Sequence, residues 1–288
     1  MSRSPITKEL ILYRNNEAGN SHAFRVNYYE GCSHGCKYCY GCALHEKKVG
    51  PYYEEWIKPV LVENALEILK EDLKHVRDKG DVFVESISDA YMPEADPKVT
   101  RQVIDLLASC GYTVFLLSKN ASLMRDIDLF RRFSQRIKVG FTLVTPSDEL
   151  RKLVEPNSSP ITERISALKK LHEAGLHTIV SLEPLLPCVS IDDYLKLIKE
   201  IDTYVTSYEP VGKLSTNIPI EFFNDQAWRG IESGRYDAHY VKLFRALLPR
   251  LGTKYRIAEH SKAFLDNYEI PYSDKPIKIS SSCDYNPF

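Results

Sequence analysis

The stretch "YYEGCSHGCKYCYGCALHEKK", residues 28–48, holds four of the chain's seven cysteines within eleven positions. Cys32, Cys36 and Cys39 follow a C-x3-C-x2-C spacing, and Cys42 comes three residues later. An odd total and so dense a group disfavour a disulfide framework in a chain of this length. Cysteines spaced in this way more often bind metal or take part in redox chemistry. The loop therefore predicts a zinc site or an iron–sulfur site.

Zinc and iron–sulfur clusters place different demands on such a loop. A closed zinc site takes four ligands, here drawn from Cys32, Cys36, Cys39 and Cys42, with His34 or His45 able to replace Cys42. Such sites normally use two ligand pairs that are separated by an intervening segment. A single short loop wraps a four-iron cluster more easily, because the irons lie at several corners and thiolates stabilise the core. Three thiolates would leave the fourth iron open for chemistry.

Length and composition describe an ordinary globular protein. The chain has 288 residues, with 43% hydrophobic and 27% charged residues and a net charge of −1. One large α/β domain or two small ones would fit this length. The near-neutral charge gives no global basic field for nucleic acid. No apolar run is long enough to span a membrane, and the N-terminus has no signal-peptide pattern. We therefore expect a cytoplasmic protein without a membrane partner.

Strand-like and helical segments alternate along most of the chain. The sequence predicts strands near residues 23–29, 81–88, 112–119, 137–144, 177–184 and 203–210. Between them it predicts helices over residues 60–78, 97–111, 122–133, 161–174 and 191–201. Such alternation is typical of a parallel sheet built from right-handed βαβ units. Six units predict an α/β fold, a partial (β/α)6 TIM-like barrel with a C-terminal extension.

The regular alternation ends near residue 225. A helix over residues 226–251, a short strand near 254–260 and an irregular tail over 275–288 are expected beyond it. We therefore expect an N-terminal segment over residues 1–23, a barrel over 24–225 and an extension over 226–288.

Polar residues gather where four successive strands are expected to end. In chain order they are Ser86, Ser88, Asp89, Ser118, Lys119, Thr142, Thr145 and Glu183. Any one of them could simply start a loop or cap a helix. In barrels, however, the carboxyl ends of the strands face the active site. Their repetition at successive strand ends therefore favours a binding site.

Five motifs occur in an order that resembles a known family. "NYYEGCSHGCKYCYG", "ESISDAYMPEAD", "LLSKNASLMRDIDLF", "GFTLVTPSDELRKLVEPNSSPITERISALKKLHEAGL" and "VSLEPLLP" follow one another over roughly residues 24–215. The cysteine loop, with Tyr38 before the last cysteine, is similar to that of the radical S-adenosylmethionine superfamily. The ordered set resembles spore photoproduct lyase and the related "DNA repair photolyase" proteins.

The resemblance implies two cofactors and an electron donor. Cys32, Cys36 and Cys39 would hold a [4Fe-4S] cluster, and S-adenosyl-L-methionine would bind its open iron. An electron from a donor such as flavodoxin or ferredoxin would cleave the cofactor to a 5′-deoxyadenosyl radical, which abstracts hydrogen from the substrate. The protein would hold the cofactor against the substrate and exclude water and oxygen.

The same resemblance implies roles for the strand-end residues. Tyr38 would lie along the adenine, while Ser88, Lys119 and Thr142 would contact the cofactor. Asp89 and Glu183 are further candidates for cofactor binding. Tyr40 matches a tyrosine that takes part in radical relay in the lyase. Packing beside the cluster is an equally good explanation for that ring.

One position departs from the lyase pattern. The lyase carries a cysteine as hydrogen-atom donor where this chain has Ser86, whose O–H bond is too strong for that role. Cys42, Tyr40 or Cys283 could replace the donor, or the reaction could differ. Cys42 and Tyr40 are the candidate catalytic residues.

The substrate has two alternatives within this chemistry. The resemblance points to a nucleobase in DNA or RNA, and hence to a lyase or DNA-repair role. A peptide or a small metabolite is the alternative substrate. A zinc- or cluster-binding module without catalysis is the alternative from another class.

Overall fold

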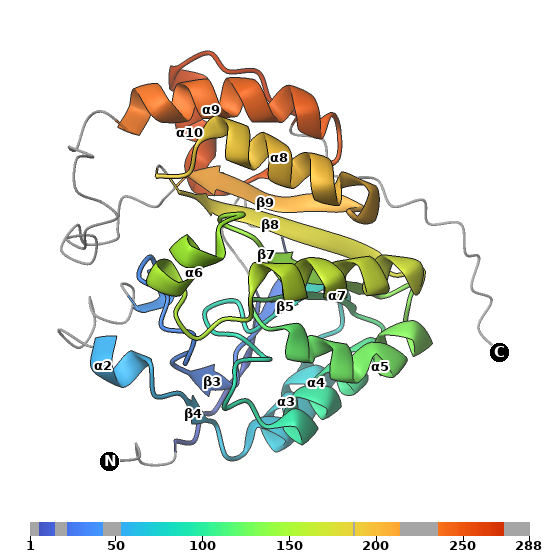
Figure 1. Ribbon diagram of the computed structural model, residues 1–288. Helices are drawn as coiled ribbons and strands as arrows, with labels where there is room; N and C mark the ends of the chain where they lie inside the picture. The colour runs from blue at the N-terminus through green and yellow to red at the C-terminus, as the bar shows by residue number, and fades with distance from the viewer. Residues whose placement is uncertain (1–5, 15–21, 43–52, 187, 214–235, 274–288) are drawn as a thin grey trace.

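A computed structural model describes residues 6–14, 22–42, 53–186, 188–213 and 236–273 (Figure 1). Its centre is an eight-stranded sheet in the order β1-β2-β5-β6-β7-β8-β9-β10. The strands are β1 (Leu12–Arg14), β2 (Phe24–Val26), β5 (Asp81–Val84), β6 (Thr113–Ser118), β7 (Ile137–Thr142), β8 (His177–Leu185), β9 (Ser207–Lys213) and β10 (Tyr255–Ile257). Every pairing from β2 to β10 is parallel, and β1 is antiparallel to β2.

The sheet confirms the predicted fold. All six expected barrel strands are present, and their order in the sheet follows their order along the chain. Within the described residues β1 and β10 do not pair with each other, so the barrel is open. The strands β6, β7 and β8 are almost wholly buried, as expected for strands that are covered on both faces.

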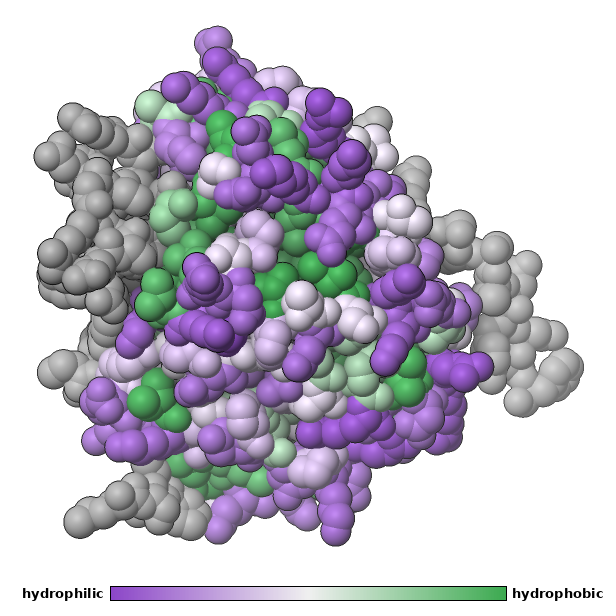
Figure 2. Space-filling model, in the orientation of Figure 1, coloured by the Kyte–Doolittle hydropathy of each residue, from purple (hydrophilic) through white to green (hydrophobic). Residues whose placement is uncertain are grey.

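Helices connect the strands and pack on the outside of the sheet (Figure 1). They are α3 (Ala65–His75), α4 (Pro97–Ser109), α5 (Ile127–Arg132), α7 (Ile161–Glu173) and α8 (Ile191–Ile201), with two short helices, α2 (Tyr53–Trp56) and α6 (Asp148–Val154). Figure 2 shows that the face over α5, α7 and α8 is mostly hydrophilic, with hydrophobic side chains between the polar ones. In the part of the chain that the structure describes, no helix is long and apolar enough to span a membrane.

Two predicted helices differ from the observed elements. The helix expected over residues 60–78 begins only at Ala65, because β4 (Val60–Leu61) pairs with β3 (Tyr29–Glu30) in a small antiparallel sheet. The helix expected over 122–133 divides into a 3-10 helix, η1 (Ala121–Asp126), and α5. A second 3-10 helix, η2 (Asp202–Tyr204), follows α8.

The region after β9 adds a further strand to the main sheet. The helix expected over 226–251 is described from Tyr236, as α9 (Tyr236–Leu251). The strand expected near 254–260 is β10, which lies parallel to β9. A last helix, α10 (Glu259–Asn267), had no counterpart among our expectations. The tail over 275–288, with Cys283, lies outside the described residues.

Charged pairs occupy the inner face of the sheet near the start of the strands. Lys138 Nζ lies 3.2 Å from Asp81 Oδ2, and Arg256 Nη2 lies 2.7 Å from Glu209 Oε2. The hydroxyl of Ser207 donates to Glu209 Oε1 at 2.7 Å. The polar residues predicted to form a site lie instead at or near the carboxyl ends of β5, β6, β7 and β8.

Candidate active site

The cysteine loop begins at a glycine that no other residue could replace without strain. Gly31 follows β3 and has a φ of +93°, which side chains on L-residues rarely allow. A Cβ at this position would lie 2.4 Å from the carbonyl oxygen of Trp56. The next residue, Cys32, donates its backbone N–H to that same carbonyl at 2.8 Å. The close approach turns the chain from β3 into the loop.

The cysteine side chains of the loop are largely withdrawn from solvent. Cys32 and Cys36 are each 9% exposed and Cys42 is 2% exposed, while Cys39 is partly buried. The backbone N–H of Cys42 donates to the Cys39 sulfur at 3.4 Å. Burial raises the pKa of the Cys32 and Cys36 thiols well above its ordinary value. Thiolates here would need a positive partner, which bound iron would supply.

Two further observations bear on what the loop can hold. Among the described residues, no three His, Cys, Asp or Glu side chains converge closely enough to hold one metal ion. All four loop cysteines belong to this described part, whereas His45, another possible zinc ligand, lies outside it. The buried hydroxyl of Ser33, next to Cys32, has no hydrogen-bond partner within the described chain. The loop therefore fits the cluster that its spacing predicts.

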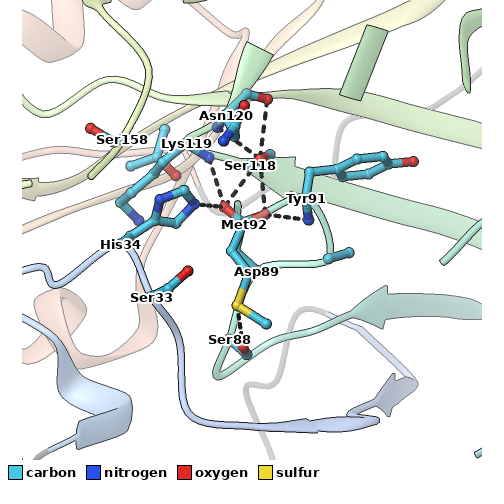
Figure 3. Close-up of polar contacts among 12 residues, drawn as sticks. Ser33, His34, Ser88, Asp89, Tyr91, Met92, Ser118, Lys119, Asn120 and Ser158 are labelled. Carbon is cyan, nitrogen blue, oxygen red and sulfur yellow. Dashed lines mark hydrogen bonds and ion pairs between the residues drawn. The ribbon is translucent and has the colours of Figure 1, made fainter. Parts of the chain in front are cut away.

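Asp89 ties the cysteine loop to the ends of two strands (Figure 3). Its Oδ2 lies 2.7 Å from His34 Nε2 and accepts the backbone N–H of Lys119 at 2.8 Å. Its Oδ1 accepts from the Tyr91 N–H and from the Ser118 hydroxyl, at 2.8 Å and 2.9 Å. Burial alone would raise the pKa of Asp89, but His34 and the N–H donors outweigh burial and lower it. The carboxylate is therefore engaged within the protein, and its predicted cofactor contact stays a prediction.

A second support for the loop comes from residues 154–159, between α6 and α7, which we call the clamp segment. Its hydrogen bonds to the loop run from Lys37 N to Val154 O at 2.9 Å, from Asn157 N to His34 O at 3.2 Å, and from Asn157 Nδ2 to Ser33 O at 2.8 Å. On its other side the N–H of Ser159 donates to Lys119 O at 3.0 Å. The clamp segment thus joins the cysteine loop to the end of β6.

A buried ion pair between Glu155 and Arg164 contacts Tyr38, which lies between two cysteines of the loop. The hydroxyl of Tyr38 donates to Glu155 Oε1. Glu155 Oε2 lies 2.6 Å from Arg164 Nη2, and neither charged side chain is exposed. Arg164 also donates to the carbonyl oxygen of Thr142 at 2.8 Å. Burial would raise the pKa of Glu155, but Arg164 and Lys119 outweigh burial and hold it below its ordinary value.

The residues predicted to bind S-adenosylmethionine lie around the loop. The Ser88 hydroxyl donates to the carbonyl of Gly31 at 2.5 Å. Lys119 Nζ lies 5.8 Å from the centre of the Tyr38 ring. Burial lowers the pKa of Lys119, but Cys36 and Glu155 more than offset this and raise it overall. Lys119 is therefore a partly buried cation beside the cysteines. Thr142 is buried at the end of β7.

The remaining candidates differ in their access to solvent. Tyr40 is 47% exposed, and its hydroxyl donates to the carbonyl of Ser86. The Ser86 hydroxyl itself donates to Asn27 Oδ1 at 3.1 Å. Glu183 faces the barrel end with 26% of its side chain exposed. Thr145 accepts the N–H of Ser147 at 3.0 Å, which is the loop-starting role expected of such a residue.

Sequence reasoning missed four residues that shape this site: His34, Glu155, Asn157 and Arg164. His34 stands inside the cysteine motif, where it was weighed only as a zinc ligand. The other three belong to the quoted motif that runs through "VEPNSSPITER". Their roles depend on contacts between segments more than a hundred residues apart, which local pattern does not reveal.

The model of the Radical SAM superfamily matches residues 26–201. This chain belongs to the radical SAM superfamily. Membership implies that S-adenosylmethionine and an iron–sulfur cluster are its cofactors. The matched range contains the cysteine loop, the clamp segment and all the predicted site residues.

Curated relatives come from an archaeon, a virus and a bacterium. An uncharacterized protein of Methanocaldococcus jannaschii is 34% identical over 171 residues, which cover 59% of this chain and 63% of that protein. An uncharacterized protein of Acidianus two-tailed virus is 24% identical over 64% of each chain. One of Mycobacterium bovis is 27% identical, over 60% of this chain and 52% of its own. The chain thus spans less than two thirds of the length of these relatives.

Solved structures of spore photoproduct lyase share the fold. The lyase complexed with dinucleoside spore photoproduct superposes with a TM-score of 0.60 at 10% identity, over 83% of this chain and 77% of that one. A mutant of the lyase with bound AdoMet and the same dinucleoside gives a TM-score of 0.59 at 11% identity, over the same shares. At this identity the similarity shows the partial-barrel fold and nothing finer.

Proposed function

We propose that this protein is a radical SAM enzyme that abstracts a hydrogen atom from a nucleobase. In this proposal Cys32, Cys36 and Cys39 hold a [4Fe-4S] cluster whose fourth iron binds S-adenosylmethionine. The observation that carries the proposal is the position of these three cysteines, two of them buried and Cys39 partly buried. They lie in one loop at the carboxyl edge of a parallel sheet, pinned to the ends of β5 and β6 through Asp89.

The cofactors would supply reductive cleavage and a primary-carbon radical. The chain's own residues would position and shield that chemistry. Tyr38, fixed by Glu155, would present its ring to the adenine. Lys119 is a partly buried cation near the loop and would contact the carboxylate or ribose of the cofactor. Ser88 and Thr142 would contribute further polar contacts at neighbouring strand ends, and a flavodoxin- or ferredoxin-type donor would supply the electron.

The choice of a nucleobase rests on charge and on the shared fold with spore photoproduct lyase. Lys119 and Arg256 both act electrostatically on Glu183, and the exposed Arg25 acts on Tyr40. Such cations suit the phosphate of a nucleotide. Because Ser86 cannot donate a hydrogen atom readily, the product radical needs another donor. Tyr40 is the better candidate, since it is 47% exposed whereas Cys42 is 2% exposed.

Anaerobic reconstitution followed by product analysis tests the proposal. The protein should bind about four iron and four sulfide ions per chain. It should form 5′-deoxyadenosine when S-adenosylmethionine and dithionite are added. Deuterium should then pass into 5′-deoxyadenosine from a single-stranded oligonucleotide with deuterated bases. Colourless protein that carries one zinc ion would overturn the radical chemistry, and transfer only from a peptide would overturn the nucleobase.

A further inference from the structure

A carboxylate and an imidazole meet near the end of β8. Glu183 lies near the end of β8, and its Oε1 is 3.4 Å from Nδ1 of His260. The two side chains are 26% and 38% exposed. His260 belongs to the first turn of α10, and no sequence motif pointed to it.

The position of His260 is fixed by the backbone around it. Its Nε2 lies 2.9 Å from the carbonyl oxygen of Lys213 at the end of β9. A Cβ on Gly212 would lie 2.6 Å from the Ala258 side chain and 3.4 Å from the Glu183 carboxyl carbon. Only glycine therefore lets α10 approach β9 and β8 this closely. In addition, the Ser261 hydroxyl accepts the N–H of Lys213 at 3.0 Å. The imidazole is held through Nε2, and its Nδ1 edge is presented to Glu183.

The surroundings of Glu183 are mainly cationic. Burial raises the pKa of its carboxylate, and His260, Lys119 and Arg256 offset part of this rise. Arg256 is held in place by Glu209, at 2.7 Å. Tyr40, beside the third cysteine of the motif, interacts in turn with Glu183. Glu183 is therefore a single partly exposed acceptor among cations, within reach of both the cofactor side and the open end of the barrel.

This combination matches the chemistry of a nucleotide. Cations bind phosphate, while an ionised carboxylate accepts hydrogen bonds only and so selects groups with N–H donors. Guanine has two adjacent donors on one edge, the ring N1–H and the exocyclic amino group. Thymine has one ring N–H between two carbonyl oxygens, and these would repel a carboxylate.

We propose that Glu183 recognises a guanine base through its N–H edge, and that His260 is a positioning residue that orients the Glu183 carboxylate for this contact. The inference rests on the proposed function and deepens it by naming the base. It assigns Glu183 to substrate binding, whereas the family resemblance implied that Glu183 binds the cofactor. It also assigns α10, which lies after the superfamily match ends at residue 201, to the substrate site.

Nucleotide binding to the reconstituted full-length protein tests the inference. The probes are dGMP, dAMP, dCMP and dTMP, measured by calorimetry with S-adenosylmethionine present. The unaltered protein should prefer dGMP over dTMP by roughly tenfold to a hundredfold, the value of hydrogen bonds to a charged group. Glu183→Gln should lose this preference and keep its affinity for S-adenosylmethionine. His260→Ala should weaken dGMP binding, and His260→Gln should restore part of it.

A control variant and a second readout separate the possible failures. Glu259→Gln changes the neighbouring acid in α10, which pairs with Lys262 at 3.0 Å, and should leave every affinity unchanged. Thermal unfolding of each variant checks folding. If 5′-deoxyadenosine forms but the protein binds no mononucleotide, or binds all four equally, the inference is wrong and the radical chemistry stands. Loss of S-adenosylmethionine binding in a folded Glu183→Gln would also overturn it. If the unaltered protein cleaves no S-adenosylmethionine, the proposed function itself fails.

Discussion

The guanidinium of Arg164 lies 2.6 Å from the carboxylate of Glu155, and solvent reaches neither side chain. The other oxygen of this carboxylate accepts the hydroxyl of Tyr38, which stands between Cys36 and Cys39. An ion pair between the clamp segment and α7 thus determines the position of a side chain in the cysteine loop. Two predictions concern this chain of contacts.

The first prediction concerns only the hydrogen bond from the Tyr38 hydroxyl to Glu155. Tyr38→Phe removes one hydroxyl and leaves the Glu155–Arg164 pair in place. We expect a loss of about 1–3 kcal/mol in the free energy of unfolding, because a hydrogen bond to a charged acceptor is removed. We also expect weaker binding of S-adenosylmethionine to the reconstituted protein, measured by calorimetry. An unchanged affinity for S-adenosylmethionine would show that the Tyr38 ring does not need this hydrogen bond.

The second prediction concerns the ion pair. Glu155→Gln and Arg164→Met should each cost about 3–5 kcal/mol in urea unfolding, because each leaves a buried charge without its partner. The double variant should cost less than the sum of the two, since it removes both charges. Lys254→Met is the matched control. It breaks a pair with Asp202 whose side chains are 44% and 42% exposed, and it should cost less than about 1 kcal/mol.

The third prediction separates the four loop cysteines. Cys39→Ala should abolish both iron binding and the formation of 5′-deoxyadenosine. Cys42→Ala should keep the cluster, because the contribution of this residue to Cys39 is its backbone N–H, which alanine retains. Iron and sulfide content after anaerobic reconstitution measures the difference. If Cys42→Ala loses its iron, Cys42 is a ligand and the three-cysteine assignment is wrong.

The fourth prediction concerns the pH dependence of stability. Burial raises the pKa of Glu85 to about 8, against hydrogen bonds from the Tyr28 and Tyr29 N–H groups that lower it. Between the ordinary carboxyl pKa and about 8, the folded protein holds a proton that the unfolded chain has released. The contribution of Glu85 to stability therefore falls as pH rises through this window.

Glu85→Gln should remove that dependence. The free energy of unfolding, measured in urea at pH 5.5 and at pH 8, should fall less between these two values in the variant than in the unaltered protein. Glu67→Gln, on an exposed face of α3, should leave the slope with pH unchanged in this window. A parallel slope in Glu85→Gln and the unaltered protein would contradict the assignment.

Much of the barrel could be predicted from the sequence because buried parallel strands leave a local signal. The apolar runs that became β6, β7 and β8, with glycines after the helices, marked the repeating units directly. The cysteine spacing likewise identified the loop that the superfamily match contains. Both signals lie within short segments, where periodicity and spacing are sufficient.

The supports of the site could not be predicted because they depend on distant segments. Asp89 looked like a cofactor residue, yet its oxygens are taken by His34, Ser118 and backbone N–H groups. Helix α10 is short, and its role depends on where β10 joins the sheet. His260 gave no signal, since a lone histidine near the end of a chain is usually a surface residue. Only the register between β9 and β10 brings it to Glu183.

The clamp segment also bears on when the protein can acquire its metal. During synthesis the cysteine loop leaves the ribosome long before residues 154–159, and His34 and Asn157 are separated by 123 positions. Until the clamp segment and α7 exist, Tyr38 and the carbonyl groups of Ser33 and His34 lack the hydrogen-bond partners described above. Iron loading should therefore follow folding of the first four barrel strands, and a nascent chain that ends before residue 164 should be a poor recipient for a cluster.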